Sequence, residues 1–267
     1  MTEIVKVGAQ PMTEIVKVGA QPMTEIVKIG TAEMRLQDCM EYMRGLPDNA
    51  FDLAITDPPY FSGPNLSGYY GKGYSSLGVQ RAKYYQDCKH WAVPGAEYFD
   101  ELKRVSMDQI IWGANHFSGA FDSGSPCWII WDKDNGASTF ADAELAYTSF
   151  KSAVRIFKYT WNGMHQGSYG GDVRKNETRI HPTQKPVKLY EWLITNYAKP
   201  GQRILDTHLG SMSSVIACLN HGFEIVGCEL DADYFKAGVE RVRKSQQQQK
   251  LFESMFLPNR EERRVDK

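Results

Sequence analysis

The chain has 267 residues, of which 42% are hydrophobic and 24% are charged, and its formal net charge is −1. This length suits one α/β domain with small insertions, and no apolar run reaches the roughly 18 residues of a membrane span. The five cysteines are scattered without a CxxC pair, and the histidines lack metal-ligand spacing. We therefore expect a cytoplasmic protein with reduced thiols and no metal.

An 11-residue repeat begins the chain. MTEIVKVGAQP occupies residues 1–11 and again 12–22, and MTEIVKIG follows at 23–30. The first two copies are predicted to be a duplicated, mobile N-terminal extension, 1–22. The third copy would begin the folded domain, and its alternation over 26–29 predicts an edge strand.

Strands and helices are expected to alternate along the rest of the chain. The predicted helices cover 39–45 with Asp38 as N-cap, 94–106, 186–198, 211–221 and 231–247. The predicted strands cover 51–56, 108–112, 127–132, 144–149, 154–161, 202–206 and 223–229. A single domain, 23–247, would thus carry inserted loops at 61–95 and 162–180 and a polar C-terminal tail, 248–267. The strand–loop–helix–strand–helix order of the last third predicts the Rossmann-like half of a doubly wound sheet.

Two neighbouring strands in that last third end in acids. Asp206 ends the strand at 202–206, and Glu229 ends the strand at 223–229. An acid at such a position can accept both hydroxyls of a ribose. The loop between them, DTHLGSMSS, lacks the glycines of a phosphate-binding turn. This favours a nucleoside cofactor without phosphates, such as S-adenosylmethionine, with a purely structural unit as the alternative.

The segment Asp57-Pro58-Pro59-Tyr60 follows the buried strand at 51–56. Its two prolines fix φ and remove two backbone donors, so the turn presents only acceptors. Such a cluster suits a planar amino group, and Tyr60 offers a flat face to a base turned out of a helix. An ordinary strand-terminating turn is the alternative.

Residues 151–188 form a basic stretch, with eight Lys or Arg against two acids and several aromatic residues between them. Bases interleaved with aromatics are typical of nucleic-acid-binding surfaces. The alternative is a solvated face over core aromatics.

Four blocks resemble the amino-methylating DNA methyltransferases, which modify adenine N6 or cytosine N4. They are QDCMEYMRGLPDNAFDLAITDPPY (37–60), IIWGANHF (110–117), HPTQKPVKLYEWLITNYAKPG (181–201) and RILDTHLGSMSSVIACLNHGFEIVGCELDADYF (203–235). DPPY precedes the cofactor loop, as in the β-type group. The resemblance implies a Rossmann-like S-adenosylmethionine-dependent methyltransferase fold, a doubly wound, mostly parallel sheet with one antiparallel strand. The DPPY spelling favours adenine N6. Cytosine N4, or a non-catalytic cofactor- or DNA-binding subunit, remains the alternative.

The resemblance also implies roles for the matching residues. The catalytic group that holds the target base would be Asp57, Pro58, Pro59 and Tyr60. The S-adenosylmethionine site would comprise Asp38, Cys39, Asp57, Thr183, Lys185, Asp206, His208, Gly210, Ser211 and Glu229. In that site Lys185 would pair with the cofactor's carboxylate, and His208 would be a flat packing partner.

The cofactor loop departs from the commonest family spelling, DPFxGSG. Thr207, His208 and Met212 replace its proline, phenylalanine and second glycine. The DTHxGS spelling resembles a phage and prophage subgroup, which favours a solitary modification enzyme over a partner in restriction–modification.

The partner implied by the resemblance is double-stranded DNA, and a homodimer stays open. The two inserted loops would grip the phosphates through Lys72, Arg81, Lys83, Arg174, Lys175 and Arg179. Since the second loop is too small to be a domain, we expect a short recognition sequence.

Overall fold

The computed structural model describes residues 3–5, 15–17, 24–60, 92–121, 124–135, 141–162, 165–167 and 176–256. The predicted loop at 61–95 therefore lies almost wholly outside the described residues, as does most of the loop at 162–180. Among the described helices, none is both long and apolar enough to cross a membrane.

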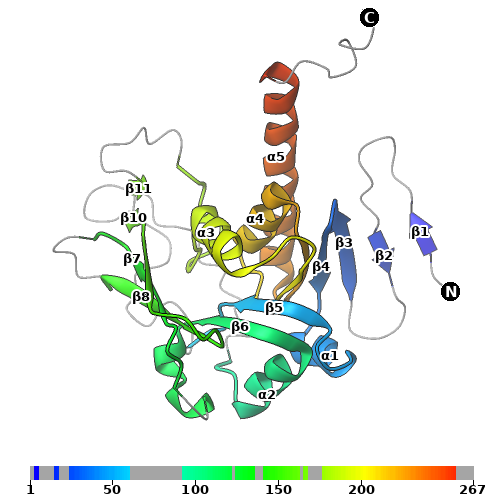
Figure 1. Ribbon diagram of the computed structural model, residues 1–267. Helices are drawn as coiled ribbons and strands as arrows, with labels where there is room; N and C mark the ends of the chain where they lie inside the picture. The colour runs from blue at the N-terminus through cyan, green and yellow to red at the C-terminus, as the bar shows by residue number, and fades with distance from the viewer. Residues whose placement is uncertain are drawn as a thin grey trace, which may run out of the picture.

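A mixed sheet forms the centre of the molecule (Figure 1). Its strands within the described ranges are β1 (Glu3–Val5), β2 (Ile15–Lys17), β3 (Glu25–Ile29), β4 (Ala32–Leu36), β5 (Phe51–Thr56), β6 (Ser106–Trp112), β7 (Ile129–Asp132), β8 (Ala143–Thr148), β9 (Arg155–Lys158), β12 (Arg203–Asp206) and β13 (Glu224–Glu229). Their order is β1-β2-β3-β4-β13-β12-β5-β6-β8-β7-β9. The central strands β4, β13, β12, β5 and β6 run parallel, so their carboxyl ends share one edge.

The predicted α/β fold with a mostly parallel sheet is confirmed. One antiparallel strand was predicted, whereas the described part of the sheet has several. β8 runs against β6 and β7, as expected for such a strand. At the other side β3 runs against β4, and β2 and β1 continue the antiparallel ribbon. Each copy of the 11-residue repeat contributes one strand to this ribbon. β3 is therefore not at the edge of the sheet, because β2 pairs with it.

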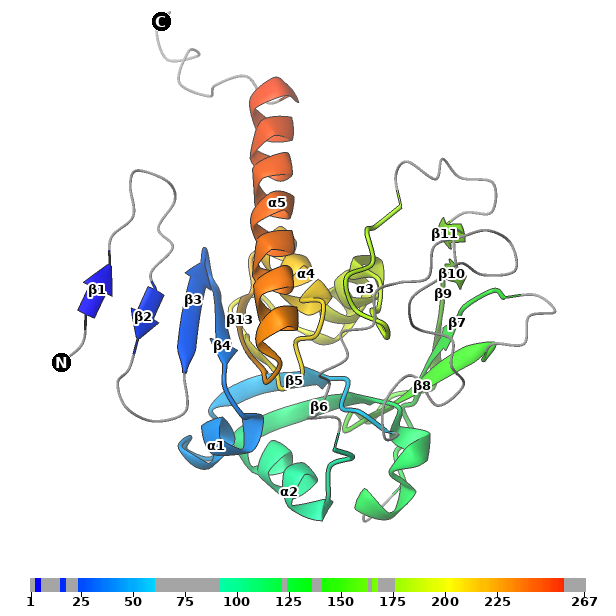
Figure 2. The same cartoon turned by 180° about the vertical axis from the view of Figure 1, so that it is seen from behind.

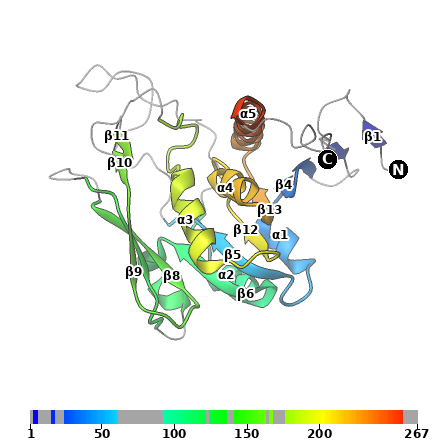
Figure 3. The same ribbon diagram turned by 45° about the horizontal axis from the view of Figure 1, so that its top comes forward.

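Helices cover both faces of the sheet, as the alternation of buried residues requires. They are α1 (Cys39–Arg44), α2 (Ala96–Val105), α3 (Val187–Tyr197), α4 (Ser213–His221) and α5 (Ala232–Phe256). Figures 1 and 2 show α1 and α2 on one side of the sheet and α3, α4 and α5 on the other. Figure 3 shows the latter three helices in front of the strands that they cover.

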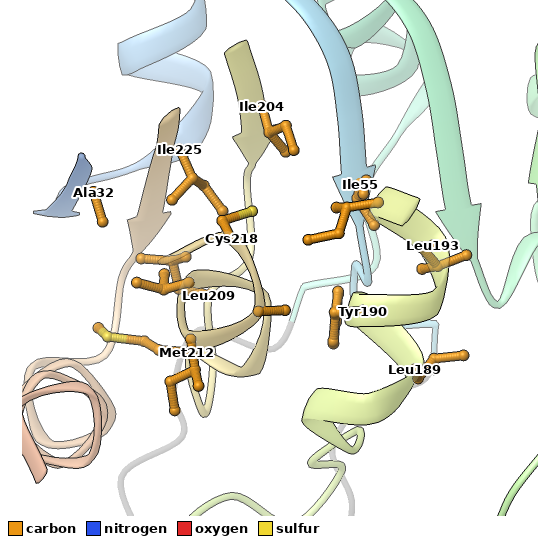
Figure 4. Packing of buried hydrophobic residues seen from close by; sticks show 14 of the residues in the cluster. Ala32, Ile55, Leu189, Tyr190, Leu193, Ile204, Leu209, Met212, Cys218 and Ile225 are labelled. Atoms are coloured by element: carbon orange, nitrogen blue, oxygen red, sulfur yellow. The ribbon is translucent and has the colours of Figure 1, made fainter. Parts of the chain in front are cut away.

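Two hydrophobic clusters follow from this arrangement. Along β5, Leu53 and Ile55 belong to the cluster under α3, α4 and α5, whereas Ala54 belongs to the cluster under α1 and α2. Ile204 and Leu205 of β12 divide in the same way. Figure 4 shows the first cluster, in which side chains of the central strands meet those of α3 and α4. A strand that is apolar on both faces belongs in the middle of a parallel sheet, which is where β5 and β12 lie.

Three elements differ from the prediction. β4 was not predicted, although Ala32, Met34 and Leu36 alternate with two charged residues and are buried. The predicted strand at 154–161 is divided at Tyr159 into β9 and β10 (Thr160–Asn162), and β10 forms a hairpin with β11 (His165–Gly167). α5 continues to Phe256 because the Gln- and Lys-rich stretch after 244 favours helix and holds no Gly or Pro.

Candidate active site

A cavity of about 610 Å³ lies at the carboxyl ends of the central parallel strands. This is the position at which doubly wound sheets bind ligands. Its walls come from the segments that follow β4, β5, β12 and β13 and from the segment that precedes α3. Of the predicted site residues, the cavity is lined by Asp38, Cys39, Asp57, Pro58, Pro59, Tyr60, Thr183, Lys185, His208, Gly210, Ser211 and Glu229. The structure thus brings together blocks that are up to 190 positions apart in the chain.

Asp206 lies beneath the cofactor loop and is absent from the cavity walls. Its Oδ1 accepts a hydrogen bond from the backbone N–H of His208 at 3.0 Å, and its Oδ2 accepts one from the hydroxyl of Ser214 at 2.5 Å. Burial raises the pKa of Asp206 to about 6. Both oxygens of Asp206 therefore help to shape the loop, and its predicted role in cofactor binding stays a prediction.

Glu229 closes the other side of the same loop. One of its oxygens accepts the backbone N–H of Gly210 at 2.7 Å, and the other accepts that of Asp231 at 2.9 Å. Burial raises the pKa of Glu229 to about 7. A carboxylate at the end of β13, held by backbone donors and facing a cavity, has the geometry that the ribose-binding prediction requires.

The substituted loop residues Thr207 and His208 belong to a buried hydrogen-bond network. The hydroxyls of Thr56, Tyr98 and Thr207 form a triangle with O–O distances of 2.6, 2.7 and 2.9 Å. Thr207 also contacts Nδ1 of His208 at 2.9 Å, and the ring of His208 packs edge-on against Tyr98. Burial lowers the pKa of His208 to about 4, so the ring is neutral at pH 7. The network ties the loop to β5 and α2, which a proline at 207 could not do.

Met212, the third substitution, has the backbone conformation that its family glycine would adopt. Its φ is 59°, in the left-handed region that non-glycine residues rarely occupy. Its side chain is fully buried and packs on Gly238, where an added Cβ would lie 2.8 Å from the Met212 Cγ. Figure 4 shows Met212 beside Leu209 within the core. Packing of the side chain therefore offsets the backbone strain.

Replacing Met212 with glycine is expected to destabilise the protein by about 2 kcal/mol. Relief of the left-handed strain gains about 1–2 kcal/mol, and loss of a buried methionine side chain costs about 2–5 kcal/mol. Chemical unfolding measures the difference. The control is Asn49→Gly, at an exposed position with φ 53°, which should change stability by less than about 0.5 kcal/mol. A Met212→Gly protein as stable as the parent would contradict the packing argument.

Asp57 has one oxygen engaged and one without a partner. Its Oδ2 forms an ion pair with Nζ of Lys185. Its Oδ1 is buried and has no hydrogen-bond partner among the described residues. Burial raises the pKa of Asp57, and the neighbouring ammonium group acts in the opposite direction. A buried carboxylate oxygen without a partner costs free energy, so it marks a position for a donor from a ligand.

Lys185 does not have the free ammonium group that pairing with a cofactor carboxylate would use. The residue is 4% exposed, and Nζ lies between Asp57 and Glu144 of β8, at 3.1 Å from Oε2 of the latter. Burial lowers the pKa of Lys185, but the two carboxylates raise it well above its usual range, so it stays charged. Its ammonium group pairs here with two protein carboxylates, and its pairing with the carboxylate of the cofactor stays a prediction.

Tyr60 is held in place by the block at 110–117. The ring of His116 stacks on Tyr60 with centroids 4.5 Å apart and an interplanar angle of 4°. Gly113 has φ 67°, and a Cβ there would lie 2.3 Å from the Tyr60 ring. The glycine of this block therefore serves both a left-handed turn and the close approach of the aromatic ring of DPPY.

The HPTQKP segment is anchored to the protein core. The Trp161 indole donates to the backbone oxygen of Gln184 at 2.9 Å, and the Gln184 side chain accepts from the N–H of Ile180 at 2.9 Å. Ser213 at the start of α4 donates to the backbone oxygen of Lys185 at 2.7 Å. These bonds fix the backbone on both sides of Lys185.

The predicted DNA-binding residues lie mainly outside the described part of the chain. This holds for Lys72, Arg81, Lys83, Arg174 and Lys175. Arg179 is described and exposed, and its guanidinium lies 4.6 Å from the centroid of the Trp161 ring. In the described ranges, no cluster of His, Cys, Asp and Glu is arranged to hold a metal ion.

Sequence reasoning missed Glu144, Tyr98 and Thr56, which contribute directly to this arrangement. Thr56 reaches the loop because β5 pairs with β12, and Tyr98 reaches it because α2 packs on this face of the sheet. One feature of the sequence could have drawn attention to Glu144, which is an acid near the start of the mainly apolar segment AELAYT. No local pattern names its partner, Lys185, which is 41 positions away.

The family model described as DNA methylase matches residues 151–240, which contain HPTQKP, the cofactor loop and Glu229. Over this segment the chain is similar to that family. This similarity supports an amino-methyltransferase of the N6/N4 type with S-adenosylmethionine as its cofactor.

Two curated proteins are similar to the chain over most of its length. The YubD protein of Escherichia coli K12, named as a methylase, is 26% identical over 234 residues, which are 83% of this chain and 96% of that protein. The type II methyltransferase M.HpaI of Haemophilus parainfluenzae is 25% identical over 236 residues, 77% of this chain and 72% of that protein.

Solved structures agree with the fold. The cytosine-N4-specific PvuII DNA methyltransferase matches with a TM-score of 0.51 at 14% identity, covering 81% of this chain and 90% of that chain. At this identity the likeness concerns the fold alone.

Proposed function

We propose that this protein is an S-adenosylmethionine-dependent DNA methyltransferase, which transfers a methyl group to N6 of adenine in double-stranded DNA. The observation that carries the proposal is Oδ1 of Asp57, which is buried and has no hydrogen-bond partner among the described residues, in a residue that lines the cavity. An exocyclic amino group carries two N–H donors. Asp57 Oδ1 can accept one of them, and a carbonyl of the proline turn can accept the other.

Both acceptors act on the nucleophile. Accepting the two N–H groups draws the nitrogen lone pair out of conjugation with the ring and points it away from Asp57. S-adenosylmethionine, when bound, supplies an electrophilic methyl group. The contribution of the protein is positioning in a site that excludes water, and it needs no general base with a raised pKa. Oδ1 of Asp57 can also receive the proton that the amino nitrogen loses afterwards.

The cofactor would lie between the loop after β12 and the residues after β4. Glu229 would accept the ribose hydroxyls, with Asp38 and Cys39 at the adenine and Thr183 near the methionine end. A volume of about 610 Å³ is within the range of roughly 300–1,000 Å³ found for cofactor pockets. Asp38 already uses one oxygen as the N-cap of α1, accepting the N–H of Glu41 at 2.9 Å, so its orientation is fixed.

The choice of adenine rests on the aspartate of DPPY, a spelling that in this family favours N6. The motif order supports the β-type group, and the DTHxGS loop supports the phage-like subgroup and a solitary enzyme. Arg179 and the basic residues at 72–83 and 174–175 are proposed to bind the DNA phosphates. The domain limits and a homodimer stay predictions.

Expression in a host that lacks DNA methyltransferases tests the proposal. Genomic DNA contains every short recognition sequence, so mass spectrometry of its nucleosides should detect N6-methyladenine. DNA from cells that express Asp57→Ala is the control and should lack it. N4-methylcytosine in place of N6-methyladenine would overturn the choice of base, and neither product would contradict the proposed activity.

A further inference from the structure

We propose that Glu144 is a positioning residue, which holds Lys185 so that its ammonium group engages Oδ2 of Asp57 and leaves Oδ1 for the target amino group. This inference rests on the proposed function, because it concerns how Asp57 is prepared for that reaction. Glu144 lies on the antiparallel strand β8, outside the four blocks that resemble the family.

The geometry around Lys185 supports this role. Nζ lies 3.1 Å from Oε2 of Glu144 and forms a second ion pair with Oδ2 of Asp57. The other Glu144 oxygen pairs with Lys133. Nζ of Lys185 also lies 5.6 Å from the ring centroid of Trp112. Glu144 is thus fixed on one side by Lys133 and holds the ammonium on the other.

A buried ammonium group with a single carboxylate partner would settle between both oxygens of that carboxylate. Lys185 instead has acceptors on two elements, since Asp57 follows β5 and Glu144 belongs to β8. The pull of Glu144 keeps Nζ toward Oδ2 and away from Oδ1. Oε2 of Glu144 has no hydrogen-bond partner among the described residues, so its hold on Nζ is the electrostatic attraction of a buried ion pair. Losing the Glu144 charge removes that attraction and should move Nζ toward Oδ1.

Several charged or titratable groups near Asp57 influence its pKa. All of them except Glu144 are the same in the parent protein and in the Glu144 variants. The charged or titratable neighbours are Lys185, Glu144, Lys133, Asp206 and Tyr190, with His181 and Tyr60 facing Lys185. Glu144 acts to raise the pKa of Asp57, and Lys185 acts to lower it. Removing the charge of Glu144 should therefore lower the pKa of Asp57.

The test is the single-turnover rate of methyl transfer to unmethylated DNA, measured against pH for Glu144→Gln. We expect the rate to fall about 10- to 100-fold, the effect of a misplaced reacting group. The affinities for S-adenosylmethionine and DNA should stay within about threefold. The acid limb of the rate profile should move to lower pH, and Glu144→Asp should recover part of the rate.

Glu33→Gln is the matched control. Glu33 lies on β4 with its side chain 18% exposed, against 19% for Glu144, and it also pairs with two cations, Lys28 and Arg35. This variant should retain the parent rate and pH profile. A merely structural role of Glu144 would lower thermal stability without moving the acid limb.

A Glu144→Gln protein with the parent rate and pH profile would overturn the inference. A loss of S-adenosylmethionine affinity as large as the loss of rate would also overturn it. If that variant does not fold, the profile of Glu144→Asp decides. A parent protein that transfers no methyl group would instead contradict the proposed function, so the two failures are distinguishable.

Discussion

Replacing Asp57 with alanine is expected to lower the single-turnover rate of methyl transfer by about 10²–10³-fold, as loss of an essential polar contact in a transition state does. Among the described residues that line the cavity, the variant removes the only buried carboxylate oxygen without a hydrogen-bond partner. Lys185 keeps Glu144 as a partner, so no buried ammonium is left without a counter-charge. Rate measurements at saturating cofactor and DNA separate this loss from weaker binding.

Asp52→Asn is the control on the same strand. Asp52 accepts the backbone N–H of Arg203 at 2.8 Å, far from the cavity walls, and an asparagine oxygen can do the same. Its transfer rate should match that of the parent. An Asp57→Ala protein that keeps a third or more of the parent rate would contradict the catalytic assignment.

The affinity for S-adenosylmethionine is expected to fall as the pH drops below about 7. Burial raises the pKa of Glu229 to about 7, so the carboxylate that would accept the ribose hydroxyls is lost by protonation there. Below that pKa the affinity should weaken by up to about tenfold per pH unit. Isothermal titration calorimetry between pH 5.5 and 8.5 measures this dependence.

Glu229→Gln identifies the group that titrates. Losing a charged acceptor costs about 1.5–3 kcal/mol, so its affinity at pH 8 should fall about 10- to 150-fold and change little with pH. Glu224→Gln, an exposed variant on the same strand, is the control and should bind as the parent does. An unchanged pH dependence in Glu229→Gln would contradict the assignment.

The raised pKa of Glu229 also has a consequence for stability. Because the folded pKa lies above the ordinary value of 4.5, this group stabilises the free protein fully only below that value. The contribution is lost as the pH rises through about 7. Bound cofactor would offset the loss, since its hydroxyls would donate to the ionised carboxylate.

The position of the site could be predicted from the sequence because strand ends carry local signals. Asp57 follows an apolar run, and Glu229 ends another, so parallel pairing of β5, β12 and β13 brings them to one edge. The motif blocks then predicted most of the cavity walls.

The partners of these residues could not be predicted in the same way. Lys185 pairs with Asp57 and Glu144, and this choice depends on how β8 pairs with β6. Asp206 is drawn beneath the loop by Ser214 and the His208 N–H. Such contacts are decided by packing across the fold, which no periodicity or spacing in the sequence specifies.

The substitutions in the cofactor loop illustrate the same limit. Compared with the spelling DPFxGSG alone, Thr207 and Met212 suggest that the loop has lost a proline and a glycine that it needs. In the structure the Thr207 hydroxyl joins those of Thr56 and Tyr98, and the Met212 side chain fills the core beside Gly238. The loop is held by different contacts, and these come from elements distant in the sequence.

The central claim is that this cavity brings the methyl donor to the amino group held by Asp57. Incubating the purified protein with unmethylated double-stranded DNA and methyl-labelled S-adenosylmethionine, followed by digestion to nucleosides, tests it most directly. The account predicts label in N6-methyladenine. Cofactor binding without label in any nucleoside would contradict it.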